Sequence, residues 1–459
     1  MAEERGFSPF RIVSLLVILL AGFIALAFFR TGGEPVISIS PATPVIGRRT
    51  PVKIEVSEPR RGLTHVKVEL VQGNNSVVLA IKTYLARSWL SVRRPRSIED
   101  TFYIDAGRES VPSLKPGTAV IRVTADRAPT WLRHPDPVTQ EVTLPVRLSP
   151  PALQITSSQV YVTQGGCEVV TYRVGESSVR DGVQSGMWWF PGFPLPGSGK
   201  QDRFAFFAVS YDESEPKVRL VAVDGAGNEA ELPFIDKFFP KPPHTDTIQI
   251  TDAFMNKVVP EILSQSPEIQ DRGNLLQNFL AINSELRKTD GETLIALAAK
   301  SKPEFLWSKP FEMMPNAKVM SAFADRRTYE YQGRVIDHQD HLGYDLASTR
   351  QSPVPAANEG VVVIARFFGI FGNAVVVDHG YGVMSLYGHM SSIGVSVGQK
   401  VTRGDILGKT GETGLAGGDH LHFTVMLQGL PVNPVEWWDG HWIRDHIAKK
   451  LGPAFHFEE

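Results

Sequence analysis

The sequence predicts a mainly β protein with an N-terminal transmembrane helix, two immunoglobulin-like β-sandwich modules, a helical connector and a glycine-rich β domain. The chain has 459 residues, which corresponds to about three domains at roughly 150 residues each. Its 40 glycines and 33 prolines favour turns and short strands over long helices. One long apolar run lies near the N-terminus, ahead of all the strand-like segments.

Residues 1–33 are predicted to be a cytoplasmic tail and a membrane anchor. The run Ile12–Phe29 carries no charge and lies between Arg11 and Arg30. As a helix it spans about 27 Å, close to the thickness of the hydrocarbon layer. A cleaved signal peptide is the alternative, because residues 25–27 (Ala-Leu-Ala) resemble a cleavage site, although signal peptides usually have a shorter apolar region. With either interpretation, the rest of the chain is expected outside the cytoplasm, in the cell envelope.

Residues 34–150 and 151–238 are predicted to be β modules. Alternating segments such as Val52–Val56 are separated by turn signals, as in a sandwich. In the second module, Val218–Asn228 resembles the late strand and turn of bacterial immunoglobulin-like modules. Asp224 and Asn228 are assigned to turn chemistry rather than to calcium, since no spaced carboxylate loop surrounds them. Neither module carries a catalytic motif, so both are expected to act as spacers or positioning elements.

Residues 239–314 are predicted to form a proline-rich linker and a helical connector. Apolar residues recur with helical periodicity over 275–286, and Thr289–Glu292 has the pattern of a capping box that starts another helix. Residues 315–440 return to strand patterns with many glycines. Residues 441–459 are expected to be a C-terminal tail.

Composition limits the chemistry that this chain can perform. Its 47 basic and 49 acidic residues give a net charge of −2, so no basic excess points to nucleic acid as a partner. The single cysteine, Cys167, excludes an intramolecular disulfide and a multi-cysteine metal site. A metal site must therefore use His, Asp and Glu. Nine of the 12 histidines lie after residue 330, which indicates that this part of the chain uses imidazole.

Two short motifs in this part carry the candidate chemistry. The first runs from His341 through Gly343 to Asp345, and the second is His420-Leu-His422 ahead of a strand-like segment. Residues i and i+2 of a strand face the same side, so the second pair can enter one cleft. A catalytic zinc needs three protein ligands and an open position for water. His341, Asp345 and one histidine of the pair supply such a set.

With their surroundings, these motifs make residues 320–438 closely resemble the lysostaphin-type (LytM-type) zinc metallopeptidases, which cut peptide bonds in bacterial cell walls. The resemblance extends over His-x-Gly-x-Asp, Val354-Pro-Ala-Ala, Gly372-Asn, Leu386-Tyr-Gly-His, Gly404-Asp-Ile-Leu-Gly and His-Leu-His-Phe. The stretch 326–340, ahead of the first motif, is less typical of the family.

The resemblance implies roles for five residues. His341, Asp345 and His422 match the ligands of one Zn²⁺ ion, and His389 and His420 match two active-site histidines that do not bind it. Elementary chemistry agrees, because one neutral imidazole can take a proton from water while another donates a hydrogen bond to the developing oxyanion. We favour His389 as the base and His420 as the oxyanion partner.

The function implied is that of a zinc-dependent metalloendopeptidase that hydrolyses peptide bonds in peptidoglycan stem peptides or cross-bridges, for cell-wall remodelling. The expected partners are peptidoglycan, the inner membrane through the N-terminal helix, and a cell-envelope regulator. The alternative is a protein that activates other cell-wall hydrolases, as do relatives that have lost their ligands; the intact five-residue set argues against it. A swinging-arm carrier domain is disfavoured because residues 398–408 lack an attachment lysine of the Met-Lys-Met type.

Other conspicuous side chains are assigned structural roles. His379 is expected at a turn, with His338 as a weaker candidate for lining the cleft. The three remaining C-terminal histidines, at 441, 446 and 456, are expected in solvent. Trp437 and Trp438 are expected to pack at the domain edge rather than to stack on sugar.

Overall fold

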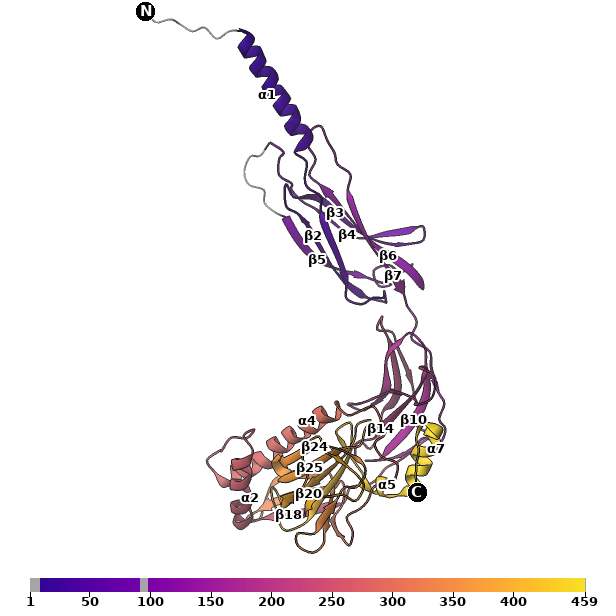
Figure 1. The fold of residues 1–459 in the computed structure, drawn as a ribbon, viewed down its shortest axis with the longest axis vertical. Coiled ribbons are helices and arrows are strands. Elements are labelled where there is room, and N and C mark those ends of the chain that lie inside the picture. The colour runs from indigo at the N-terminus through magenta and orange to yellow at the C-terminus, as the bar shows by residue number, and fades with distance from the viewer. Residues whose placement is uncertain (1–8, 91–97, 459) are drawn as a thin grey trace, which may run out of the picture. The chain divides into compact units, whose positions relative to one another are not determined.

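The computed structural model describes residues 9–90 and 98–458 (Figure 1). The chain divides into two compact units, which are described separately below. The first comprises residues 1–151, 177–179 and 223–229, and the second comprises residues 152–176, 180–222 and 230–459. Strands outnumber helices among the described elements, which confirms the mainly β class.

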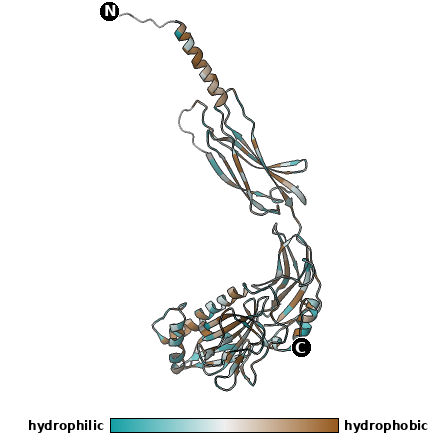
Figure 2. Ribbon diagram, viewed as in Figure 1, coloured by the Kyte–Doolittle hydropathy of each residue, from teal (hydrophilic) through white to brown (hydrophobic). Residues whose placement is uncertain are grey.

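The first unit begins with helix α1 (Pro9–Phe29), which is long and apolar enough to cross a membrane and is hydrophobic along its length (Figure 2). Two antiparallel sheets follow and share one core. Burial alternates along their strands, so every second side chain points into that core. This arrangement is a β-sandwich, and its immunoglobulin-like class stays a prediction. The sheets are β1 (Val36–Pro41), β2 (Thr50–Glu58) and β5 (Ile98–Ala106), and β4 (Asn75–Thr83), β3 (Leu63–Gln72), β6 (Gly117–Arg127) and β7 (Val138–Val146).

The second β module also has two sheets of short strands. Its central strand β10 is buried at almost every position, which explains its nearly continuous apolar sequence. The turn at Asp224 is closed by that carboxylate, which accepts from the N–H groups of Ala226 and Asn228, as turn chemistry requires. The strands are β13 (Phe193–Pro194), β14 (Asp202–Ala208), β10 (Cys167–Val174) and β8 (Leu153–Ile155); β12 (Trp188–Pro191), β11 (Ser178–Ser185), β15 (Val218–Asp224) and β16 (Glu229–Leu232); and the parallel pair β9 (Tyr161–Thr163) and β17 (Lys237–Phe239).

The glycine-rich domain is built on one large sheet that carries the candidate site. Its strands β25, β26 and β30 are buried on both faces. In order the sheet runs β19 (Lys318–Ser321), β22 (Tyr344–Ala347), β30 (Leu421–Leu427), β26 (Val383–Gly388), β25 (Asn373–Asp378), β24 (Gly360–Phe367) and β28 (Lys400–Val401), with β31 (Leu430–Val432) beside β30. A smaller sheet contains β23 (Pro353–Pro355), β29 (Ile406–Lys409) and β27 (Ser392–Ile393).

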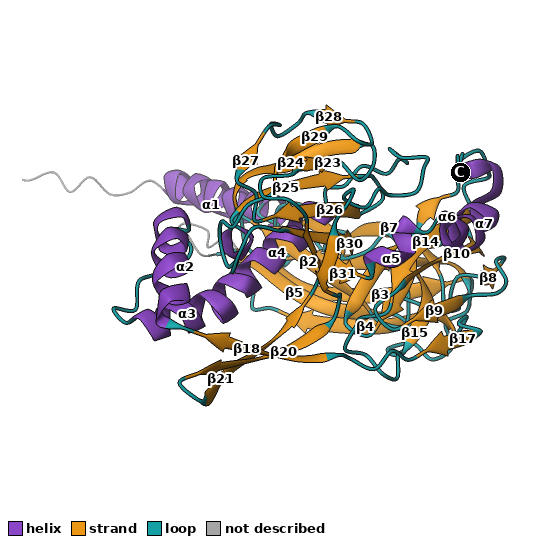
Figure 3. Ribbon diagram, turned by 90° about the horizontal axis from the view of Figure 1, so that it is seen from below, coloured by secondary structure: helices purple, strands orange, loops and turns teal. Residues whose placement is uncertain are grey.

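A third sheet joins the connector to this domain. Its parallel pair brings β18 (Thr245–Ile250) beside β20 (Asp325–Tyr331), which continues into β21 (Arg334–His341). The less typical stretch 326–340 is therefore the hairpin β20–β21. Helices α2 (Asp252–Gln265) and α3 (Leu275–Ala281) lie beside this sheet (Figure 3) and share a core with it. The buried residues of α4 (Arg287–Ala298), Leu294 and Ala298, share a core with β24, β25 and β26 of the large sheet instead.

The capping box expected at Thr289 is wrong. α3 runs through a π-helical turn, Ile282–Leu286, directly into α4, so residue 289 lies inside a continuous helix. The Thr289 hydroxyl donates to the carbonyl of Glu285 instead of capping. Asp290 is buried and accepts the N–H of Ile370, beside the short 3₁₀ turn Gly369–Phe371. The polar pattern serves packing against the glycine-rich domain rather than a helix start.

The second β module shares its core with the glycine-rich domain, which differs from the expected role of an independent spacer. Phe204 contacts Phe305 and Tyr381 at ring-centroid distances of 5.8 and 5.0 Å. Buried Glu436 accepts the N–H of Cys167 at 2.8 Å. These contacts join segments more than 100 residues apart in the chain, and one continuous apolar core covers both parts. The module is therefore part of the domain that carries the site.

The C-terminal residues are folded onto this shared core, and the prediction that His446 is solvated is wrong. His446 Nδ1 lies 2.6 Å from a carboxylate oxygen of buried Glu168, and Lys450 Nζ lies 2.8 Å from the other. His441 and His456 are exposed as expected, with side chains 83% and 84% accessible. The elements are α5 (Pro434–Trp438), α6 (Gly440–Ile443), a π-helical turn (Arg444–Ala448), α7 (Lys449–Leu451) and a 3₁₀ turn (Gly452–Ala454).

The shared core generates a prediction about truncation. A chain that begins at residue 152 should fold, because it retains both parts of the core. A chain that begins at residue 239 should unfold at a clearly lower temperature or aggregate, since it exposes the aromatic face around Phe305. Thermal unfolding of both chains checks this. Equal transition temperatures would contradict a shared core.

Glu436 generates a prediction about pH. Burial raises the pKa of Glu436 to about 8, although the N–H of Cys167 favours the ionised form. Because the pKa is raised in the folded state, the stability that this carboxyl contributes is present at low pH and is lost as pH rises towards 8. The Glu436→Gln variant should therefore gain thermal stability relative to the wild type as pH increases. The exposed Glu292→Gln is the control and should track the wild type at every pH.

Candidate metal centre and active site

Strand pairing brings the two sequence motifs together. β22 pairs with β30 in an antiparallel register that places Asp345 directly opposite His422. Opposed residues of such a pair project from the same face, so the two side chains meet. His341 is the last residue of β21 and reaches the same point from the neighbouring hairpin. All three predicted ligands therefore lie in one group.

Three potential ligand atoms converge at this point. His341 Nε2 lies 3.0 Å from Asp345 Oδ1 and 3.1 Å from His422 Nδ1, and the latter lies 3.1 Å from Asp345 Oδ1. Ligands of a tetrahedral zinc ion are separated by roughly 3.3 Å, given bond lengths near 2.0 Å. The spacing thus matches a small divalent cation.

The outer atoms of the same side chains fix which atoms face inward. His341 Nδ1 donates to the carbonyl of Ala322 at 2.9 Å. The Thr424 hydroxyl donates its proton to the Leu342 carbonyl. It therefore accepts a hydrogen bond from His422 Nε2, at 3.0 Å. Both imidazoles therefore turn a lone pair towards Asp345 Oδ1. Three electron-rich atoms at this distance repel one another unless a cation lies between them, so the residues present fit a metal.

Arg327 fixes the second oxygen of the carboxylate. Its Nη2 donates to Asp345 Oδ2 at 2.9 Å and to the Ser321 hydroxyl at 2.8 Å. The arginine comes from β20, in the stretch that is less typical of the family. No sequence motif predicts that Arg327 contacts Asp345, because the two residues are 18 positions apart and the contact depends on how the hairpin packs.

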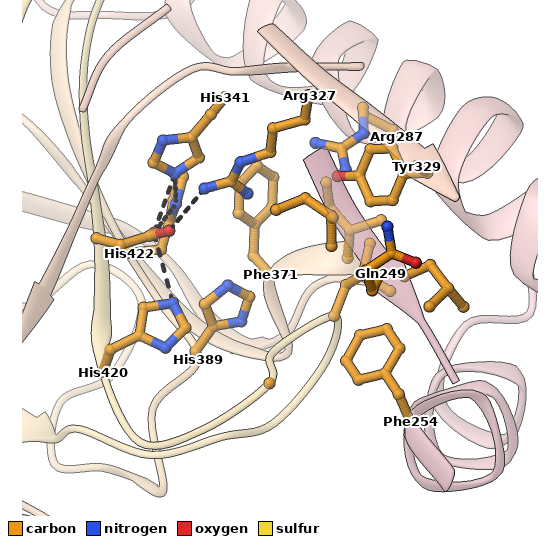
Figure 4. Close-up of a pocket in the computed structure, with 16 residues that line it drawn as sticks. Gln249, Phe254, Arg287, Arg327, Tyr329, His341, Phe371, His389, His420 and His422 are labelled. Atoms are coloured by element: carbon orange, nitrogen blue, oxygen red, sulfur yellow. Dashed lines mark hydrogen bonds and ion pairs between the residues drawn. The ribbon is translucent and has the colours of Figure 1, made fainter. Parts of the chain in front are cut away.

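Two further histidines flank the group, with ring centroids 4.9 Å apart (Figure 4). His389 follows β26 in a left-handed conformation, with φ of 63°, and its Nδ1 donates to the Thr413 carbonyl at 2.9 Å. Non-glycine residues adopt this conformation at a cost, so the surrounding fold holds the ring in place. His420 Nδ1 donates to the Gly418 carbonyl at 2.8 Å, and its Nε2 lies 3.4 Å from Asp345 Oδ1.

Burial and charge separate the proton affinities of these groups. Burial lowers the pKa of His422 to about 4 and holds the pKa of His389 well below its ordinary value. Burial also opposes the charge of His420, but the neighbouring carboxylate of Asp345 raises its pKa overall. The pKa of Asp345 lies well below its usual value, because the surrounding histidines outweigh its burial. The fold thus keeps His389 neutral and Asp345 ionised.

The five side chains open into a cavity of about 320 Å³ whose opposite wall is formed mainly by residues that precede the segment resembling the family. That wall is formed by β18, α2, α4 and β20 (Figure 4), and its lining includes Phe254, Arg287 and Tyr329. No motif in the sequence indicates this wall. Its apolar residues follow ordinary strand and helix patterns, which do not reveal what a strand faces.

The remaining candidates have structural roles. His379 is fully buried, donates to the Glu359 carbonyl, and has a pKa lowered by burial to about 4. His338 is exposed on the hairpin and does not line the cavity. Trp437 is buried, and Trp438 stacks on Phe423 at 5.6 Å, which confirms packing rather than an open sugar-stacking face.

Comparison with known proteins agrees with this geometry. Residues 339–434 match the family model of Peptidase family M23. This M23 segment contains all five histidine and aspartate side chains of the site, and the match confirms the resemblance seen in the sequence.

Curated relatives extend the match. The chain is 32% identical to the peptidoglycan DD-endopeptidase ShyA of Vibrio cholerae over 185 residues. This alignment covers 39% of this chain and 40% of that relative. Over 95 residues the chain is 40% identical to the DD-carboxypeptidase/endopeptidase Mpg of Neisseria meningitidis, which covers 21% of this chain and 22% of that relative. The chain thus spans less than half the length of each relative. The solved catalytic domain of lysostaphin from Staphylococcus simulans aligns at 23% identity with a TM-score of 0.21, over 31% of this chain and 96% of that domain.

Gly343 generates a prediction about the metal centre. A Cβ at this position would lie 2.6 Å from His422 Nε2 and 2.6 Å from the Thr424 hydroxyl. Gly343→Ala should therefore displace the His422 ring and lower zinc affinity at least tenfold, measured by competition with a chelating dye. The control is Gly417→Ala, where a Cβ meets nothing within 4 Å. Equal zinc affinities in the two variants would contradict the close packing of His422.

Proposed function

We propose that this chain is a zinc-dependent metalloendopeptidase that hydrolyses peptide bonds in peptidoglycan stem peptides or cross-bridges. The observation that carries the proposal is the convergence of His341 Nε2, Asp345 Oδ1 and His422 Nδ1 inside a segment that matches Peptidase family M23. One similar protein is named a peptidoglycan DD-endopeptidase and another a DD-carboxypeptidase/endopeptidase, which supports the same class of reaction and substrate.

In this proposal His341, Asp345 and His422 bind one zinc ion. Their outer atoms are held by Ala322, Arg327 and Thr424, which orient the ligands without taking part in binding. A bound zinc supplies a Lewis acid that polarises the scissile carbonyl and acidifies a water molecule.

His389 and His420 act on the reacting atoms. The Nδ1 proton of His389 is committed to the Thr413 carbonyl, so its Nε2 is free to accept a proton from the attacking water. After the attack, the same nitrogen can return that proton to the leaving amine. His420 presents Nε2 on the side of Asp345 and the cavity. Because Nδ1 already donates to the Gly418 carbonyl, Nε2 donates to the developing oxyanion when the ring is protonated, a form that the Asp345 carboxylate favours against burial by raising the pKa of His420.

The charge of the cavity supports an acidic peptide as substrate. Asp345 is the one carboxylate among the described residues that line the cavity, and the proposed metal neutralises it. Arg287 and Arg327 line the same cavity. Peptidoglycan stem peptides carry free carboxylates, which complement this positive surface.

The location that we propose is the cell envelope, with α1 as an anchor in the inner membrane and the catalytic domain outside the cytoplasm. A helix of 21 residues is about 31 Å long, enough to cross the hydrocarbon layer. Removal of this segment as a signal peptide is the competing outcome.

A set of alanine variants tests the function and the division of roles. Ala at His341, Asp345 or His422 should lower zinc content and activity together. His389→Ala should keep near-stoichiometric zinc while activity falls about 10²–10⁴-fold, the range for a removed general base. His420→Ala should also keep zinc and lose about 10²–10³-fold, as expected for a lost oxyanion donor.

The measurements are zinc content, peptide release from purified peptidoglycan, and thermal unfolding with zinc to confirm folding. The exposed His441→Ala is the matched control and should behave as the wild type. Loss of zinc from His420→Ala but not from His422→Ala would reverse the assignment within that pair. A wild-type protein that binds zinc, digests no peptidoglycan and stimulates another hydrolase would favour the activator function instead.

A further inference from the structure

An exposed apolar patch lies on the first unit, in the two loops beside the end of α1. Leu85 is 97% exposed, Leu90 56%, Trp131 67% and Leu132 45%. Together with the half-buried Trp89 we call these five residues the hydrophobic collar. They follow β4 and β6, at the end of the sandwich where α1 enters it. Large apolar side chains gathered in this way on a surface usually mark a binding site.

A buried arginine ties these loops to the end of the helix. Arg61 donates to the carbonyls of Arg30 and Pro129, both at 2.8 Å, and to the carbonyl of Arg87 at 3.0 Å. One guanidinium thus joins the residue after α1 to both loops of the collar. The N–H of Gly32 also donates to the Ala128 carbonyl at 2.8 Å. The helix end and the collar are therefore held in a fixed relation.

Buried Glu58 supports the same junction. Its carboxylate accepts the N–H of Gly33 at 2.7 Å and the N–H of Arg61 at 2.6 Å. These bonds fix the chain leaving α1 to the start of the sandwich. The segment between helix and module is a rigid joint rather than a free linker.

The collar contacts α1 well inside its apolar run. The Phe23 ring lies 5.2 Å from the Trp89 ring and 6.4 Å from the Trp131 ring. Phe23 precedes the end of the helix, Phe29, by six residues, which is about 9 Å along the axis. Amphipathic protein surfaces that lie on a membrane bury their apolar side about 5–10 Å deep, and tryptophan is enriched at this level.

Positive charge lies where the lipid headgroups would be. The guanidinium of Arg133 lies 5.5 Å from the centre of the Phe28 ring, at the end of the helix. Arg30 and Arg87 lie at the same joint, as their carbonyl contacts with Arg61 show. Cationic side chains at this depth are attracted to anionic phospholipids.

We propose that the hydrophobic collar inserts into the outer leaflet of the membrane that α1 crosses, so that the first β module is seated on a phospholipid bilayer. The proposal rests on the membrane anchor proposed above. The observations that favour a bilayer are the shared depth of the collar and the apolar helix, and the arginines at the level of the headgroups. The rigid joint then sets the angle at which the module leaves the membrane.

Fluorescent labelling of the full chain tests the collar. The native cysteine, Cys167, is buried and is replaced by alanine, and single cysteines are introduced as Leu85→Cys or Leu132→Cys. Asn74→Cys is the control, because it is exposed in the turn at the opposite end of β4. Each protein is labelled with an environment-sensitive dye and reconstituted in phosphatidylethanolamine–phosphatidylglycerol vesicles, with or without a nitroxide on the lipid chains.

The labels at 85 and 132 should shift to the blue and lose emission to the nitroxide lipids, while the label at 74 should do neither. The collar proposal is overturned if the labels at 85 and 132 emit like the label at 74. This conclusion requires that the protein stays in the membrane during an alkaline wash. A blue shift without quenching by the nitroxide lipids, which increases with the protein-to-lipid ratio, also overturns the proposal. That result would indicate contact with a second copy of the chain. Release by the wash, or a mature N-terminus near Phe28, overturns the anchor together with the collar.

Discussion

The antiparallel pairing of β22 with β30 is the constraint on which the candidate site depends. It sets Asp345 opposite His422, and the third ligand atom, from His341, reaches the pair because β21 ends immediately before β22. A shift of one residue in this register would turn one of the two side chains to the opposite face of the sheet. The close approach also requires Gly343 between the strands, since a side chain there would collide with the His422 ring.

Hydrogen bonds from outside the metal-binding group orient the three ligand side chains. Each imidazole of the group gives its outer proton to an oxygen, and Arg327 holds the outer oxygen of Asp345. The atoms that face inward therefore present lone pairs to the space between them, and a cation is the group that fits there. The same reasoning applies to His389, whose Nδ1 donates to the Thr413 carbonyl and whose Nε2 is left with a lone pair.

The parts of the chain that surround the M23 segment also shape the site. Strands β18 and β20 and helices α2 and α4 form the far wall of the cavity, and Arg287 and Arg327 give this wall a positive character. The second β module and the C-terminal helices complete the core behind the catalytic sheet, with Glu436 and Glu168 making buried polar contacts across it. The M23 segment is therefore embedded in a larger unit, which explains why residues 152–238 cannot be regarded as a simple spacer.

Short-range patterns in the sequence were sufficient to predict the mainly β class, the apolar N-terminal helix and the five side chains that the structure brings together. These features are local: two histidines at i and i+2 where one strand begins, a glycine between two ligands, and an uninterrupted apolar run are all visible in short stretches of sequence. The family resemblance then supplied the expected roles of the five residues.

Tertiary structure alone decided the rest. It brought Arg327 to Asp345, Arg287 and Phe254 to the cavity, His446 to Glu168, and Arg61 to the carbonyls that join the helix end to the collar loops. The capping pattern at Thr289 misled because packing against the catalytic sheet favoured one continuous helix. Each of these outcomes depends on contacts between segments far apart in the chain, and periodicity or spacing within one segment contains no information about which distant segment it will meet.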